Sequence, residues 1–241
     1  MTSSDFPTRL RALCIAATAF ALAACGTEER DGPLAPTGPF GRVRFVNAVP
    51  DAAVGALNAS LEGVAFAAGL AAGAATPYHP VYTGERALVV RRTADTAAVL
   101  LNAPFTVADG GAYTVVAAGR AANVTPVVLT DTIAINPTDS ARVRVAHLSP
   151  SAGPVDVYVT TTTASIATAT PAVASLPYQS AARYLRVPNG RIRIRVTAAG
   201  TKTVAADDTT NVLAAAQIRT VLVLDRAGGG TPPRLVTLTD R

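Results

Sequence analysis

Apolar and polar residues alternate along several short segments in the second half of the chain. Residues 191–196 have the sequence Arg-Ile-Arg-Ile-Arg-Val, and residues 155–159 have the sequence Val-Asp-Val-Tyr-Val. A strict period of two is the pattern of a β-strand that buries one face. Residues 113–116 and 220–224 are instead nearly continuous apolar runs, which are typical of central strands. These patterns predict a chain built from β-strands.

Turn-forming residues separate the predicted strands. Pro188-Asn189-Gly190, Asp109-Gly110-Gly111 and the glycines at 228–230 each interrupt the apolar pattern. We expect about seven short strands in every hundred residues or so, which is the size of an immunoglobulin-like sandwich. The alanine-rich segments 64–75 and 164–174 fit neither period. For them the sequence leaves a short helix and a long loop open.

The chain contains an internal duplication. Residues 40–50 and 140–150 share Arg-Val-Arg and a later proline at an offset of 100 positions, and Pro77-Tyr78 has a counterpart in Pro177-Tyr178. Leu-Thr-Asp then recurs near the end of each copy. A repeat of this length indicates two similar domains rather than a solenoid, whose units are shorter.

The duplication gives a prediction for fold class and domain limits. We predict an all-β protein with two tandem immunoglobulin-like β-sandwiches, the first at 40–131 and the second at 140–241. Residues 132–139 contain Asn-Pro and no apolar periodicity, so we interpret them as a linker.

The amino terminus has the features of an export signal. Arg9 and Arg11 precede thirteen uncharged residues, Ala12 to Ala24, a length that suits a signal peptide and is too short to cross a bilayer. The segment ends Leu-Ala-Ala-Cys-Gly, which resembles a bacterial lipobox. That resemblance implies removal of residues 1–24 and lipidation, including palmitate, of Cys25. An uncleaved helix and an ordinary secretory signal are the alternatives.

A short spacer follows the cysteine. Residues 25–39 carry prolines at 33, 36 and 39, a spacing that favours polyproline II or a disordered tether. We therefore expect a protein of the cell envelope, held at a membrane through its lipid. Gly26 stands where an inner-membrane retention signal would place Asp, so the outer membrane is favoured in a cell with two membranes.

The second repeat carries a resemblance to a known family. Residues 142–150, Arg-Val-Arg-Val-Ala-His-Leu-Ser-Pro, and the strand pattern at 154–159 resemble the opening of the bacterial family called domain of unknown function 4397 (DUF4397). Leu-Pro-Tyr at 176–178 and Val-Pro-Asn-Gly at 187–190 resemble its middle. The first repeat is similar more loosely, with Asn47 in place of the histidine. The resemblance implies secreted or lipid-anchored β-sandwich proteins of no established activity.

Residues suited to catalysis or metal binding are few. His147 lies close in sequence to Ser149 and Asp156, but no Gly-x-Ser-x-Gly elbow is present to build an oxyanion hole. We expect His147 to cap a turn or to bond a loop carbonyl. Two histidines and two cysteines, one in the signal, make a zinc site improbable. We predict no catalytic residues, no metal and no cofactor.

Basic residues outnumber acidic residues in the sequence, and nearly all of them are arginines. The formal net charge is +5, and Lys202 is the only lysine. Arginines alternate on two predicted strands, where guanidinium groups could bind carboxylates or phosphates, or could instead keep a sheet face soluble. Nucleic acid is disfavoured because no aromatic stacking motif accompanies them. The candidate anion-binding residues are Arg142, Arg144, Arg191, Arg193 and Arg195.

These features support a non-catalytic structural, adhesion or assembly module of the cell envelope. Its expected partners are the membrane, through the lipid anchor, and an envelope polysaccharide or protein. The alternative is a binding module for anionic glycans or envelope polymers that uses the arginine-lined sheet faces. Salt-sensitive binding to purified envelope polysaccharide would distinguish the two. A hydrolase is a third hypothesis, which loss of an activity on His147→Ala would support.

Overall fold

The structure is a computed structural model that describes residues 38–132 and 139–240. Every helix or strand within these residues is a β-strand. All of the described residues belong to one compact unit. The predicted signal peptide, Cys25, most of the spacer and most of the linker lie outside the described residues. The all-β prediction is confirmed.

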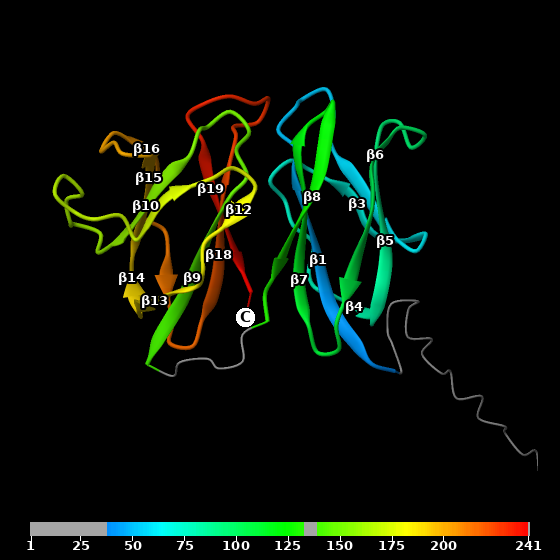
Figure 1. Ribbon diagram of the computed structural model, residues 1–241, viewed down its shortest axis with the longest axis horizontal. Helices are drawn as coiled ribbons and strands as arrows, with labels where there is room; N and C mark the ends of the chain where they lie inside the picture. Colours follow the sequence, from blue (N-terminus) through cyan, green and yellow to red (C-terminus); the bar gives the residue numbers. More distant parts are fainter. Residues whose placement is uncertain (1–37, 133–138, 241) are drawn as a thin grey trace, which may run out of the picture. The chain divides into compact units, whose positions relative to one another are not determined.

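The strands of the first half form two four-stranded sheets, which we call the first sandwich (Figure 1). One sheet has the order β4-β1-β7-β8 and the other the order β3-β2-β5-β6. Strands β1 and β7 are parallel, and the other pairs in these sheets are antiparallel. The eight strands are β1 (Phe40–Ala48), β2 (Leu57–Leu61), β3 (Val64–Leu70), β4 (His79–Tyr82), β5 (Gly84–Arg92), β6 (Val99–Val107), β7 (Ala112–Arg120) and β8 (Asn123–Thr130).

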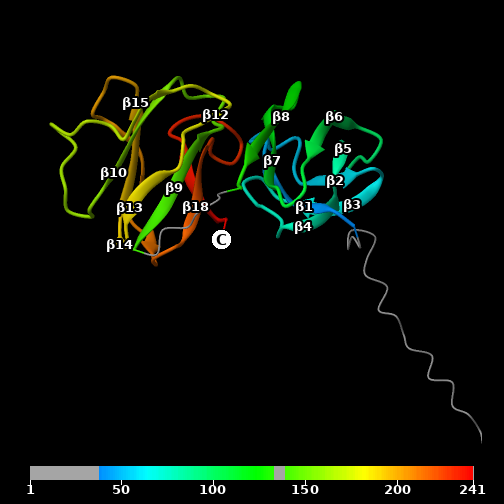
Figure 2. The ribbon, with the colours of Figure 1, turned by 60° about the horizontal axis from the view of Figure 1, so that its bottom comes forward.

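The second half repeats this strand order in a second sandwich (Figures 1 and 2). One sheet has the order β12-β9-β18-β19 with β13 also on β9, another has the order β11-β10-β15-β16, and β14 pairs with β17. Strands β9 and β18 are parallel, as β1 and β7 are. The strands are β9 (Ser140–His147), β10 (Val155–Thr160), β11 (Val173–Leu176), β12 (Ser180–Ala181), β13 (Leu185–Pro188), β14 (Gly190–Arg191), β15 (Arg193–Ala198), β16 (Val204–Asp208), β17 (Val212–Leu213), β18 (Ile218–Leu224) and β19 (Arg234–Thr239).

Two expectations about local structure need correction. The first half has eight strands rather than about seven, because the alanine-rich segment 64–75 begins with strand β3 and is neither a helix nor only a loop. Burial does not alternate along β3, because the neighbours Phe66 and Ala67 are both buried and its register with β2 shifts. The sequence therefore shows no period of two there. Segment 164–174 is a loop that ends in the first residues of β11.

The pairing of tyrosines between the repeats also needs correction. Strand β4 lies on β1 with His79 opposite Val43, and β13 lies on β9 with Leu185 opposite Val143. The residue before β4 is Tyr78, and the residue before β13 is Tyr184. Tyr78 therefore corresponds to Tyr184 and not to Tyr178.

Each sandwich has its own apolar core between its two sheets, and a third apolar cluster joins strands of both sandwiches. In the third cluster β1, β7 and β8 of the first sandwich meet β9, β18 and β19 of the second. This explains why β7 and β18 contain nearly continuous apolar runs, since both of their faces are buried. Its fully buried or nearly buried members are Val46, Ala48, Val116, Ala118, Leu129, Ala146, Leu148, Leu222 and Leu224.

Candidate functional site

The most elaborate polar arrangement in the structure lies between the two sandwiches. Arginine, threonine and aspartate side chains from both halves form a closed circuit of hydrogen bonds at one end of the third apolar cluster. The circuit occupies equivalent positions in the two sandwiches, with each residue type represented once in each half. We call it the six-residue ring: Arg44, Thr114, Asp131, Arg144, Thr220 and Asp240.

The first half of the ring begins at Arg44 on β1. Its Nε donates to Oγ1 of Thr114 at 2.7 Å, and its Nη1 donates to the carbonyl oxygen of Thr239 at 2.9 Å. Its Nη2 forms an ion pair with Asp240 of the second sandwich. The hydroxyl of Thr114 in turn donates to Oδ2 of Asp131 at 2.5 Å. The guanidinium thus uses all of its nitrogens, and two of its three hydrogen-bond partners, Thr114 and Thr239, lie in strands.

The second half of the ring repeats these contacts in the opposite direction. Arg144 on β9 donates from Nε to Oγ1 of Thr220 at 3.1 Å and from Nη1 to the carbonyl oxygen of Thr130 at 2.9 Å. Its Nη2 forms an ion pair with Asp131 of the first sandwich. The hydroxyl of Thr220 donates to Oδ2 of Asp240 at 2.6 Å. Each sandwich therefore supplies one arginine to the other sandwich's aspartate.

Two tyrosines complete the ring. Tyr78 donates to Oδ2 of Asp131 at 2.7 Å, and Tyr184 donates to Oδ2 of Asp240 at 2.8 Å. The guanidinium carbon of the arginine from the same sandwich lies 4.7 Å and 4.5 Å, respectively, from the centroid of the tyrosine ring, which is cation–π geometry. Burial first, and then the nearby aspartate charge, raise the pKa of both phenols far above the ordinary range. Both tyrosines are therefore neutral donors at physiological pH.

The ring changes the interpretation of the candidate arginines. Arg144 is not part of an exposed anion-binding stripe, because its side chain is only 5% exposed and is committed to Asp131. Its strand face is covered by another sheet, which alternation within one strand cannot reveal. Arg142, two residues earlier on the same face, is half-buried.

The second predicted stripe is also largely committed. Arg193 donates to both carboxylate oxygens of Asp207 and, at 3.2 Å, to the carbonyl oxygen of Thr162. Arg195 is buried and donates to the carbonyl oxygen of Ala164 at 2.7 Å. Hydrogen bonding to Asp207 raises the pKa of Arg193, whereas burial lowers the pKa of Arg195. Of the five candidate arginines, Arg191 alone is exposed.

His147 bonds a loop carbonyl, and the residues near it do not form a catalytic triad. Its Nε2 lies 2.9 Å from the carbonyl oxygen of Gly153, and its Nδ1 lies 3.4 Å from the backbone nitrogen of Ser149. The Ser149 hydroxyl donates to Asp225 instead. Asp156 accepts the backbone N–H groups of Ser175 in β11 and of Gly200 in the turn after β15. The three residue types are close in sequence, but the strand end directs their side chains to separate partners.

Asn47 performs the role of His147 in the first sandwich. Its Nδ2 donates to the carbonyl oxygen of Leu70 at 2.9 Å, and its Oδ1 accepts the backbone N–H of Val49 at 3.0 Å. Both side chains thus donate to a backbone carbonyl, that of Leu70 at the end of β3 or that of Gly153 in a loop, and accept from the N–H two residues later. For His147 this geometry requires the neutral tautomer with hydrogen on Nε2. Burial is the main reason that its pKa lies below the ordinary value of 6.5.

We expect the stability of the protein to fall as pH drops below about 6.5, and we expect His147→Asn to remove most of that dependence. The folded state has the lower histidine pKa, so the unfolded chain binds the proton first and stability is lost with falling pH. Urea unfolding between pH 7.5 and 5 measures the effect. His79, a half-buried histidine of β4, provides the control in His79→Asn. An unchanged pH profile in His147→Asn would contradict this assignment.

Asp225, which directly follows β18, is a second buried group and contacts the loops that contain Ser151 and Gly230. Burial alone would raise its pKa, but hydrogen bonds from the hydroxyls of Ser149 and Ser151 and from the N–H of Gly230 outweigh it and lower the pKa. Arg120 of the first sandwich reaches this cluster and donates to Oγ of Ser151 at 2.7 Å. The cluster is a second polar contact between the sandwiches.

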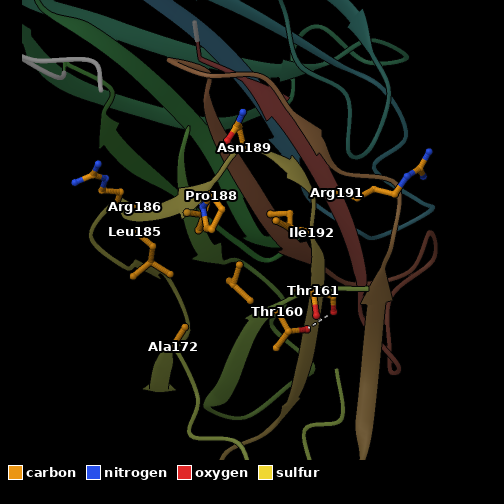
Figure 3. A pocket seen from close by; sticks show the side chains of 11 residues that line it. Thr160, Thr161, Ala172, Leu185, Arg186, Pro188, Asn189, Arg191 and Ile192 are labelled. Atoms are coloured by element: carbon orange, nitrogen blue, oxygen red, sulfur yellow. Dashed lines mark hydrogen bonds between the residues drawn. The ribbon is translucent and has the colours of Figure 1, made fainter. Parts of the chain in front are cut away.

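A hollow lies in the second sandwich, beside the ends of β10 and β14 and along β13 (Figure 3). Its volume is about 440 Å³. Val159, Leu185 and Ile192 supply apolar walls, and Arg191 lies at its rim. Among the described residues no group of three or more His, Cys, Asp or Glu side chains is placed to hold a metal ion. Likewise, the described part of the chain contains no helix able to span a membrane.

Comparison with known proteins identifies a domain in this chain. Residues 41–158 match the family described as "Domain of unknown function (DUF4397)". The chain contains a DUF4397 domain. The sequence patterns predict the closer resemblance in the second repeat. The match instead covers nearly all of the first sandwich and extends into the second sandwich only as far as Tyr158 in β10. The Arg-Val-Arg openings of β9 and β1 both lie within the matched residues.

Other comparisons add little to the DUF4397 match. No curated protein matches the chain. Among solved structures, similarity is found to a leucine-rich repeat protein from Bacteroides thetaiotaomicron VPI-5482 at 10% identity, covering 80% of this chain and 27% of that chain, with a TM-score of 0.22. At this score the likeness supports no argument about fold or function.

Proposed function

We propose that the protein is a non-catalytic structural module of the cell envelope, in which two sandwiches act as one rigid block on a lipidated tether. The observation that supports it most directly is the six-residue ring. Its reciprocal ion pairs join arginines on β1 and β9 to aspartates that directly follow β19 and β8, and the apolar cluster beside it is built mainly from strand residues. Such a block is suited to present or space other components at a membrane surface.

The chemistry of the described residues agrees with a non-catalytic role. The groups most suited to catalysis, His147 and Ser149, are buried and hydrogen-bonded to structural partners. The adjacent carboxylates Asp207 and Asp208 are directed to Arg193 and to Asn211, respectively, and do not share a proton. Binding of polymeric anions through arginine stripes receives less support, because Arg144 and Arg195 are buried.

The anchor is testable through its cysteine. We expect intact-mass spectrometry of the membrane-extracted protein to show a chain that begins at Cys25 and carries acyl groups, because the segment before it has the length and composition of a lipoprotein signal. Stable anchoring needs more than one acyl chain. The Cys25→Ser variant should lack the mass of the acyl groups, and it should no longer need detergent to be extracted from the membrane.

Cys14→Ser is the matched control, since Cys14 lies inside the proposed signal and leaves with it. It should be indistinguishable from the natural chain after processing. An unmodified thiol at position 25 in the membrane fraction would contradict the anchor and, with it, the proposed location. A rigid block is tested separately by the interface substitutions described in the Discussion.

A further inference from the structure

The two sandwiches differ most in the connection between their second and third strands. In the first sandwich Glu62 and Gly63 join β2 to β3 in a tight turn, with φ values of 49° and 78°. In the second sandwich the twelve residues 161–172 join β10 to β11. Because loops carry function more often than the strands that they connect, this added segment is a natural place for a site.

The added segment is held in one conformation by three cationic side chains. Arg193 and Arg195 donate to the carbonyl oxygens of Thr162 and Ala164. Lys202 donates to the carbonyl oxygen of Ala169. Two of the candidate anion-binding residues, Arg193 and Arg195, thus bind the backbone of this loop. A wall that is already fixed reduces the entropy lost when a ligand binds.

The cavity of about 440 Å³ opens beside this segment. The added segment is one cause of this opening, and a break in a strand is another. In the first sandwich β5 is continuous from Gly84 to Arg92, whereas in the second sandwich β14 and β15 are separated at Ile192 and β14 pairs with β17. Figure 3 shows Ala172, Leu185, Ile192 and Thr160 around the same space. The volume is within the range of ~300–1,000 Å³ that holds small ligands. The apolar lining residues are Val159, Ala172, Leu185, Val187, Pro188 and Ile192.

The charge around the cavity has one sign. Its charged lining residues are both arginines, Arg186 and Arg191, which extend outward on opposite sides of it in Figure 3. Arg186 pairs with Asp139 at 2.6 Å, but both side chains are more than 60% exposed, so that pair is weak. Asn189 and Thr160 add neutral hydrogen-bonding groups. An apolar interior with a cationic mouth complements a ligand that has an apolar body and a single anionic end.

We propose that this cavity binds one fatty-acyl chain, with its hydrocarbon against Leu185 and Ile192 and its carboxylate at Arg191. A planar guanidinium can donate two parallel hydrogen bonds to a carboxylate, which favours this headgroup. The hydrocarbon gains affinity because it removes apolar lining from water. Binding of such a ligand goes beyond the structural role proposed above and does not depend on it.

The test uses the full chain carrying Cys25→Ser, so that no acyl group of its own competes, and isothermal titration with dodecanoate. We expect saturable binding with one site per chain. Arg191→Gln should weaken it by about tenfold, the loss of one charge-assisted hydrogen bond. Arg183→Gln, an exposed arginine that does not line the cavity, should leave it unchanged.

The apolar part of the site is tested by filling it. Ala172 is exposed at the cavity wall, so Ala172→Trp should leave the fold intact, which circular dichroism checks, and should abolish binding. Dodecanol should bind the parent chain about tenfold more weakly than dodecanoate does. The Arg191→Gln variant should bind dodecanol and dodecanoate with equal affinity. The proposal is overturned if dodecanoate does not bind at about 1 mM. It is also overturned if binding survives Ala172→Trp, or if inorganic phosphate binds at Arg191 and dodecanoate does not.

Discussion

Arg44→Ala should destabilise the protein by about 3–5 kcal/mol, because it leaves a buried carboxylate without its cation. The side chains of Arg44 and Asp240 are only 4% and 1% exposed. The substitution also removes the donors to Thr114 and to the carbonyl of Thr239. The midpoint of urea unfolding should fall by about 1–2 M. Arg183→Ala removes an exposed arginine and should change the midpoint little.

Two further variants separate loss of the ion pair from loss of packing. Arg44→Lys keeps the charge but cannot reach all three partners as a guanidinium does, so its effect should be intermediate. Combining Arg44→Ala with Asp240→Ala should destabilise less than the sum of the two single changes, since neither charge is then left alone. Strict additivity of the two substitutions would show that the pair does not couple the sandwiches.

The ring illustrates how much of this molecule the sequence predicts. Alternation correctly placed a strand at 155–159, and a nearly continuous apolar run correctly placed one at 220–224. The duplicated Arg-Val-Arg lies in β1 and β9, which occupy the same position in sheets of similar strand order. The partners of Arg44 and Arg144 were missed, because a strand pattern shows which side chains share a face but not what covers that face. A signal was present, since Arg44 and Arg144 each stand between apolar residues and an aspartate recurs near the end of each copy.

The equivalence of Tyr78 and Tyr184 was missed for a different reason. The offset between the repeats is 100 positions at their openings, but insertions such as residues 161–172 change it further along. A constant offset therefore paired Tyr78 with Tyr178, whose ring packs against His147 instead. The cavity could not be predicted either, because it results from a strand changing its pairing partner at Ile192, which no local pattern specifies.

Leu222→Ala should reveal whether the two sandwiches unfold together. Leu222 is fully buried in the apolar cluster that joins β18 to strands of the first sandwich. Truncating such a leucine costs about 2–5 kcal/mol from lost burial and the cavity left behind. Because that loss falls on the contact between the sandwiches, we expect calorimetry to show one transition for the natural chain and a broadened or divided transition for the variant.

Leu57→Ala provides the matched comparison for this experiment. Leu57 is equally buried but belongs to the core within the first sandwich. If the interface is as strong as the ring and the apolar cluster indicate, Leu57→Ala should lower the temperature of a transition that stays single, because both sandwiches still unfold as a unit. Two separate transitions in the natural chain would mean that the two sandwiches unfold independently, and the proposal that they form one rigid block would then be wrong.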